Sequence, residues 1–168
     1  EIRLSLVGSE MCIRDRKNIG VAYEMYFDMV YRICYLYMNG CGADSEDACQ
    51  QVFLKYMEHG GGFDSGEHEK AWLIVTAQNT CKSMLRRVYR RHVSLSEAEN
   101  VMVEDKADGI MEEILKLPEK EKTAIYLHYY EGYSGAEIAR LLKCRESTIF
   151  SYLHRGRKRL KKRLEEQL

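Results

Sequence analysis

The sequence predicts an all-α protein made of two small helical domains. Apolar residues recur at three- and four-residue steps through most of the chain, which is the period of an amphipathic helix. The 168 residues contain one proline, Pro118, together with abundant Glu, Lys, Leu, Met and Tyr, so a strand-rich sandwich with many turns is not expected. Hydrophobic residues make up 45% and charged residues 31%, which predicts a packed core and excludes wholesale disorder.

The first domain is expected over residues 17–92 as three helices. Apolar residues at helical spacing predict each helix, and glycines separate them. Asp44 or Ser45 is expected to cap the second helix, and a polar, Gly-rich loop at 59–69 precedes the third. The expected spans are residues 21–38, from 44 or 45 to 59, and about 70–91.

The second domain is expected over residues 109–168. A short helix stops at Pro118, and another follows with acids in its first turn, where the helix dipole favours them. Ser134 and Glu137 form a capping box that opens a short helix. A tight turn at 143–144 then leads into a strongly basic last helix, which together make a helix-turn-helix pattern.

The net charge is zero, with 26 basic and 26 acidic residues, but the two signs are segregated. Residues 82–92 hold five Lys or Arg and no acid, and seven of the nine residues at 155–163 are basic. Residues 97–113 between them hold seven acids and one Lys. This pattern predicts two modules that each meet a polyanion, joined by an acidic linker at 93–108.

The first 16 residues are expected to be foreign to the domain. Residues 6–16, LVGSEMCIRDR, resemble a translated reading frame of a transposon-based sequencing-library adapter, and we exclude residues 1–16 from fold reasoning. The alternative is a genuine amphipathic extension. If the segment is an adapter, Cys12 is not a natural cysteine.

The cysteines and the hydropathy of the chain indicate which cellular compartment to expect. Six cysteines without a CxxC pair or regular spacing predict neither a disulfide framework nor a zinc site, so a reducing cytoplasm is the expected compartment. No run of about 18 apolar residues occurs, so no membrane span is expected. Charges interrupt the apolar start of the chain, so no secretory signal is expected either.

Three segments resemble motifs of one protein family. DSEDACQQVFLKY at 44–56 is similar to D-x-E-D-x-x-Q-x-V-F, and KAWLIVTAQNTCKSMLRR at 70–87 is similar to W-L-x-x-x-A-x-N with a basic end. Residues 117–160 resemble an L-P-x-x-x-R/K segment, an E-I-A helix and a T-V-x-S-R-L-x-R-A-R/K recognition helix. In order and spacing they resemble RNA polymerase sigma factors of the extracytoplasmic-function group, in the sigma-70 family.

The resemblance implies that the first domain opens promoter DNA at the minus-ten element and holds flipped bases of one strand. Strand capture needs cations for the phosphates and aromatic or polar pockets for unstacked bases. Trp72 is instead expected to pack in the core. The candidates for the minus-ten contacts are Phe63, Asn79, Lys82, Arg86, Arg87 and Arg90.

The resemblance also implies that the last helix reads the duplex minus-35 element from the major groove. Ile149 and Leu153 are expected to lock this helix against its neighbour. The candidates for DNA contact are Arg145, Glu146, Ser147, Phe150, Ser151, His154, Arg155 and Lys158. Four departures from the family pattern leave the promoter sequence open: Lys143 replaces a usual Gly in the turn, Phe150 a usual basic residue, Tyr152 a usual Arg, and Gly156 a usual Ala.

Core RNA polymerase and promoter DNA are the partners that the resemblance implies, and an anti-sigma factor stays open as a third. In the family the second helix docks on the polymerase. The candidates for that surface here are Asp47, Gln50, Phe53 and Leu54.

Two other functions were weighed against a sigma factor. A helix-turn-helix regulator that binds duplex DNA without polymerase is the alternative, but it has no need of segments 44–56 and 72–87. An enzyme acting on nucleic acid is not expected, because no carboxylate cluster has metal-ligand spacing and the five histidines are scattered. No catalytic residue, metal or cofactor is expected.

Overall fold

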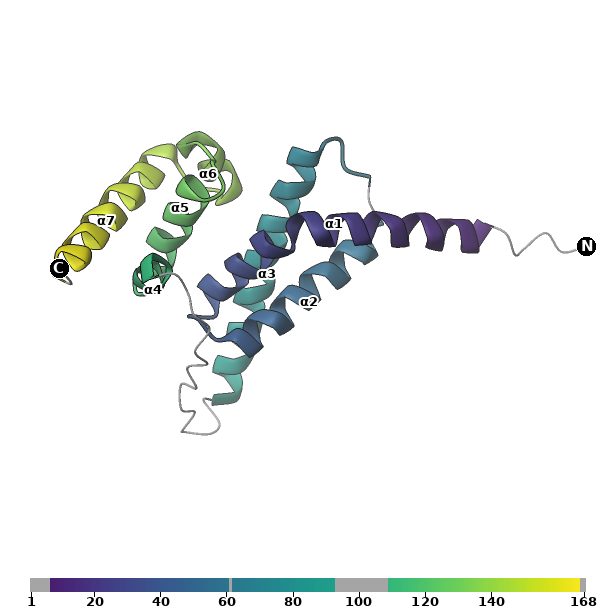
Figure 1. Ribbon diagram of the computed structural model, residues 1–168, viewed down its shortest axis with the longest axis horizontal. Helices are drawn as coiled ribbons and strands as arrows, with labels where there is room; N and C mark the ends of the chain where they lie inside the picture. Colours follow the sequence, from purple (N-terminus) through teal and green to yellow (C-terminus); the bar gives the residue numbers. More distant parts are fainter. Residues whose placement is uncertain (1–6, 61, 93–108, 167–168) are drawn as a thin grey trace, which may run out of the picture.

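The described part of the chain folds into seven helices in two lobes (Figure 1). This computed structural model describes residues 7–60, 62–92 and 109–166, and side chains at 19–60, 62–88 and 109–166. The first lobe contains α1 (Val7–Tyr37), α2 (Gly42–His59) and α3 (Gly66–His92). The second contains α4 (Gly109–Leu115), α5 (Glu119–Tyr129), α6 (Gly135–Leu141) and α7 (Glu146–Glu165). The all-α prediction is confirmed over these ranges, and the expected linker at 93–108 lies outside them.

Two helices of the first lobe begin earlier than expected. The helix expected from Val21 already begins at Val7, so residues 7–16, which we excluded, continue α1. α2 begins at Gly42 with Cys41 as its N-cap, so the expected cap at Asp44 or Ser45 is wrong. The Ser45 hydroxyl instead donates to the carbonyl of Cys41 from inside the first turn.

The third helix begins at Gly66, about one turn before the expected start. Its first turn is stabilised by the Ser65 hydroxyl, which accepts a hydrogen bond from the His68 N–H at 3.1 Å. The Gly-rich loop is therefore shorter than expected. His68, which we expected on that loop, lies on α3.

The helix-turn-helix of the second lobe follows the predicted pattern. The Glu137 N–H donates to the Ser134 hydroxyl at 3.3 Å, and the Ser134 N–H donates to the Glu137 carboxylate at 2.8 Å. These bonds from Ser134 lower the pKa of Glu137 below its usual value. Lys143 occupies the left-handed turn position with φ of +51°. This is the position where the family resemblance implies a usual glycine.

The first lobe has a core in which α1 packs against both α2 and α3. Cys34, Cys49 and Cys81 are buried there, one from each helix, as small apolar side chains. Burial raises the pKa of the Cys49 thiol to about 12. The pKa of Cys34 is also raised, mainly by a hydrogen bond with Cys81 and to a smaller extent by burial. The thiols of Cys34 and Cys49 therefore stay protonated near neutral pH.

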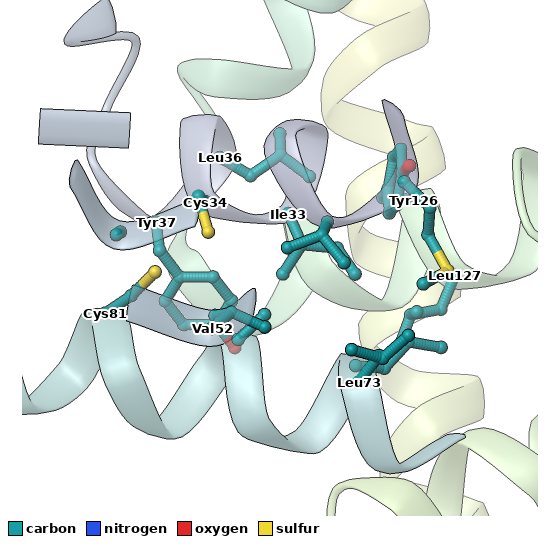
Figure 2. Packing of buried hydrophobic residues seen from close by; sticks show 14 of the residues in the cluster. Ile33, Cys34, Leu36, Tyr37, Val52, Leu73, Cys81, Tyr126 and Leu127 are labelled. Carbon is teal, nitrogen blue, oxygen red and sulfur yellow. The ribbon is translucent and has the colours of Figure 1, made fainter. Parts of the chain in front are cut away.

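The two lobes share one hydrophobic core. Residues 121–127 of α5 are all buried, because α5 packs against α6 and α7 on one side and against α1 on the other. Figure 2 shows Ile33 and Leu36 of α1 in the same packed region as Leu73 of α3 and Tyr126 and Leu127 of α5. The prediction of two helical domains therefore needs one addition, since the second lobe docks directly on the first.

Polar contacts also cross between the lobes. The buried Lys122 ammonium donates to the Asn39 side-chain oxygen at 2.8 Å, and burial lowers the pKa of Lys122. A salt bridge of 2.9 Å joins Lys70 to Glu131. Further contacts join the Thr123 and Tyr37 hydroxyls at 3.3 Å and Lys82 to Glu119 at 3.9 Å.

Candidate nucleic-acid interface

The last helix is held against α5 by a narrow apolar seam. Ile149 and Leu153 are buried on this seam, so the expectation that they lock α7 is confirmed. Gly156 is buried on the same side, and a Cβ there would lie 2.9 Å from Cγ1 of Ile125. Glycine at 156 therefore lets α5 and α7 approach closely, which is why a residue with weak helix propensity is accommodated here.

The opposite side of α7 is open to solvent. Figure 1 shows α7 on the outer edge of the second lobe, with α5 between it and the first lobe. Arg145 is the N-cap residue, so the candidate side chains begin where the backbone N–H groups of the first turn point outward. All eight predicted residues, from the N-cap to just past the middle of this helix, are exposed: Arg145, Glu146, Ser147, Phe150, Ser151, His154, Arg155 and Lys158.

A buried carboxylate fixes part of the cationic surface of α7. The Glu121 side chain is 6% exposed, and its oxygens lie 3.7 Å from Nε of Arg155 and 3.1 Å from Nε of Arg159. The Arg155 guanidinium also lies 5.4 Å from the Tyr152 ring centroid. Glu121 of α5 thus holds the Arg155 side chain in place. The sequence did not indicate this contact, because Glu121 lies two helices earlier in the chain. Held cations lose less side-chain freedom when they bind a phosphate.

The Gly-rich loop of the first lobe folds onto an aromatic cluster. Phe63, which is half-buried, stacks on His59 with ring centroids 4.8 Å apart and lies 5.6 Å from Trp72. Tyr56 and His68 complete this cluster. The expected packing role of Trp72 is confirmed, and Phe63 presents only part of its ring.

Glu69 anchors the start of α3 and was missed by the sequence reasoning. Its carboxylate accepts hydrogen bonds from the Tyr56 hydroxyl on α2 and, at 3.5 Å, from the Tyr26 hydroxyl on α1. Burial, together with this carboxylate, raises the pKa of both tyrosines. Glu69 thereby ties all three helices together beside the loop. A Glu in a first turn has an ordinary dipole role, so its sequence position gave no signal.

The predicted strand-binding residues of α3 do not form one group. Asn79, Arg86 and Arg87 are exposed along the helix. Lys82 faces the second lobe instead, where it pairs with Glu119 and lies 5.5 Å from the ring centroid of Tyr37. The side chain of Arg90 lies outside the described residues. In this arrangement Lys82 serves the contact between the lobes.

The predicted polymerase surface on α2 is exposed except at one residue. Asp47 and Gln50 are exposed one turn apart, and Leu54 is 56% exposed on the next turn. Phe53 is 5% exposed and its ring centroid lies 4.8 Å from that of Tyr23. The assignment of Phe53 as a contact residue is therefore wrong: it packs α2 against α1 beneath the surface.

An apolar groove between α4, α5 and α7 was not predicted. Ile110, Tyr129 and Leu164 are exposed on its walls, with Ile114, Ile125 and Leu160 beneath them. In the sequence, each of these apolar residues taken alone is explained by ordinary packing between helices. The four-residue spacings of Ile110 with Ile114 and of Leu160 with Leu164 were the available signal.

Comparison with known proteins decides the family. A family model described as Sigma-70 region 2 matches residues 22–91, and one described as Sigma-70, region 4 matches residues 107–160. The chain is 28% identical over 163 residues to the ECF RNA polymerase sigma factor SigW of Bacillus subtilis, covering 85% of this chain and 87% of that protein. This chain belongs to the sigma-70 family, in its extracytoplasmic-function group.

One further relative is similar to this chain in sequence, and two solved structures are similar to it in fold. The chain is 28% identical over 151 residues to SigM of Mycobacterium tuberculosis, covering 87% of this chain and 76% of that one. The fold is similar to the sigma factor RpoE in complex with the anti-sigma factor NepR from Bartonella quintana. That match has a TM-score of 0.73 at 21% identity and covers 89% of this chain and 98% of that chain. CnrH in complex with the cytosolic domain of CnrY matches with a TM-score of 0.63 at 16% identity, covering 95% and 96% of the two chains.

The described part of this sigma factor contains neither a candidate metal site nor a helix that could span a membrane. Among the described side chains, at residues 19–60, 62–88 and 109–166, no three His, Cys, Asp or Glu side chains are arranged to hold a metal ion. Over the same stretch of sequence, every helix is too short or too polar to cross a bilayer.

Proposed function

We propose that this sigma factor binds core RNA polymerase and directs it to a two-part promoter in the bacterial cytoplasm. The second lobe reads duplex DNA at the minus-35 element, and the first lobe holds one strand at the minus-ten element and aids its melting. The observation that carries this proposal is the outward face of α7, where eight exposed polar, aromatic and cationic side chains lie opposite a buried apolar seam.

The geometry of α7 suits a major groove. The groove admits one α-helix, whose N-terminal half then contacts base edges while flanking cations contact phosphates. Ser147, Ser151 and His154 offer hydrogen-bonding groups on this half, and Arg155 and Lys158 offer positive charge. The Arg155 guanidinium, held by Glu121, is best placed for a phosphate rather than a base.

The first lobe offers a weaker but consistent surface for a single strand. Arg86 and Arg87 are exposed toward the end of α3, and Asn79 lies exposed about two turns before them. Cations along a helix neutralise phosphates, and the partly exposed Phe63 ring next to this helix offers a stacking surface for a base.

The α2 surface of Asp47, Gln50 and Leu54 is the proposed polymerase contact. An exposed leucine beside a carboxylate and an amide is typical of an interface whose apolar centre has a polar rim. Since RpoE was solved with an anti-sigma factor, an anti-sigma factor is also a proposed partner of this chain.

Binding to purified core RNA polymerase tests the proposal. We expect Asp47→Lys to weaken binding of the full chain at least tenfold, because it reverses a charge in the contact. Glu112→Lys reverses an exposed charge on α4 and should leave the affinity unchanged. Equal affinity of the Asp47→Lys variant and the unmodified chain would refute the α2 assignment.

A regulator that binds duplex DNA without polymerase is the second candidate. The observation that favours it is the exposed face of α7, which could contact a duplex without the first lobe. The same experiment separates the two, because such a regulator has no affinity for core polymerase. In both cases duplex binding should fall steeply with salt, since released counterions dominate it.

A further inference from the structure

Phe150 is an exposed aromatic ring within a polar and cationic helix face. It lies on the second turn of α7 and is 56% exposed. Its neighbours on that face are Glu146, Ser147, Ser151 and His154, all of them polar and one of them acidic. The burial of a ring of this size on binding contributes favourable free energy only where the partner offers an apolar group.

The ring of Phe150 is held in place by the start of α6. A Cβ on Gly135 would lie 3.3 Å from Cζ of the ring and 3.4 Å from Cε1, so the ring packs directly over this buried glycine. Its remaining surface faces a hollow that Ser151, His154 and Arg155 also line. An aromatic ring that is already positioned loses little conformational freedom when it meets a partner.

The charges around the ring favour a nucleic acid as that partner. Arg145, Arg155 and Lys158 are exposed around this segment and outnumber its exposed acid, Glu146, which suits a polyanion whose apolar groups lie in a groove. In the major groove of unmodified duplex DNA, the base edges carry one apolar group, the 5-methyl of thymine. A phenylalanine ring is among the side chains that make this contact.

We infer that Phe150 is a specificity-determining residue that contacts the 5-methyl group of one thymine in the duplex read by α7. This inference rests on the proposed function, because it requires α7 to lie in a major groove. Ser151 and His154 then read polar groups of the neighbouring bases, and the ring selects thymine over cytosine at its own position.

Replacement of single thymines by deoxyuridine tests the contact, since deoxyuridine lacks only the methyl group. Duplexes are first selected from a random pool with the full chain bound to core RNA polymerase. Each thymine of the selected sequence is then replaced in turn. We expect one replacement to weaken binding three- to tenfold. With Phe150→Ala, the thymine and deoxyuridine duplexes should bind equally at that position.

A matched variant controls for general loss of exposed apolar surface. Met25→Ala removes a side chain that is 65% exposed on α1, and it should keep the full preference for the methyl group. The inference is overturned if no single replacement weakens binding, if Phe150→Ala keeps the preference, or if Met25→Ala loses it. It is also overturned if Phe150→Ala weakens binding to polymerase instead, since the ring would then be a protein contact.

The result separates this inference from the proposed function. If duplexes are enriched and no methyl group matters, the proposed function stands and the role of Phe150 is wrong. If no duplex is enriched at all, both are wrong.

Discussion

The buried Lys122 ammonium donates a hydrogen bond of 2.8 Å to the side-chain oxygen of Asn39, an exposed residue, and this bond joins the two lobes. Lys122 lies on α5, which carries the DNA-reading helix on its other side, and Asn39 lies in the turn after α1. Because Asn39 has φ of +52°, this turn is fixed in a conformation that few residue types adopt readily. The bond is therefore one of several contacts that hold the second lobe against the first.

Truncation of Lys122 should loosen this contact between the lobes. We expect Lys122→Ala to lower the free energy of unfolding by about 1–2 kcal/mol, because a charge-assisted hydrogen bond is lost while some desolvation cost of the ammonium is relieved. Urea unfolding measures the stability, and small-angle scattering should show a larger radius of gyration. Lys120→Ala changes an exposed lysine of the same helix and should leave both unchanged. Equal effects of the two variants would contradict the role of the bond.

A methyl group at position 156 should destabilise the second lobe. In Gly156→Ala the new Cβ meets Ile125 at 2.9 Å, and overpacking of this kind costs about 1–3 kcal/mol, which exceeds the gain in helix propensity of about 1 kcal/mol. Gly20→Ala is the matched control, because Gly20 lies inside α1 with no atom within 4 Å of its added Cβ. Thermal unfolding should show opposite signs for the two substitutions. Stabilisation by both would mean that α5 and α7 are not in close contact.

Glycine at position 143 should stabilise the helix-turn-helix. Lys143 holds φ of +51°, and a residue with a Cβ in this region costs about 1 kcal/mol relative to glycine. Part of this gain is offset by the greater freedom of glycine in the unfolded chain, so we expect Lys143→Gly to add about 0.5 kcal/mol. Lys120→Gly, inside α5, should instead lower stability by up to about 1 kcal/mol. Chemical denaturation of both variants measures the difference.

Alkaline pH should weaken the fold through its buried tyrosines. Burial raises the pKa of Tyr37 from its ordinary value of 10.0 to about 12. Between these values the folded state binds more protons than the unfolded state, so stability is intact below pH 10 and is lost as pH rises toward 12. The Tyr37→Phe variant should lose about 2 kcal/mol less over this window. A pH profile of Tyr37→Phe that is identical to that of the unmodified chain would contradict the assignment.

The sequence predicted what depends on short-range pattern. Helix periodicity located the apolar seam of Ile149 and Leu153, and the Ser134 capping box lies where the S-G-A-E motif placed it. The tight turn at 143–144 was also expected from its place between two helices, and Lys143 lies in it with φ of +51°. Each of these features is decided within a few residues, so local physical rules are sufficient.

The features that the sequence did not predict depend on contacts between distant segments. Lys82 looked like one member of a basic cluster, but Glu119 of the other lobe lies 3.9 Å away. The family motif placed Phe53 on the polymerase surface, yet it is 5% exposed and its ring lies against Tyr23 of α1. Glu121 holds Arg155 from a different helix. A pattern along one helix carries no information about which partner will cover it.

Run-off transcription by core RNA polymerase on a pool of random promoters, with and without the full chain, tests the central claim most directly. We expect the chain to produce transcripts from templates that share two separated sequence elements, and Asp47→Lys to abolish most of this product while Glu112→Lys keeps it. A chain that selects duplex DNA but adds no transcripts above those of core enzyme alone would contradict a sigma function and leave only a duplex-binding protein.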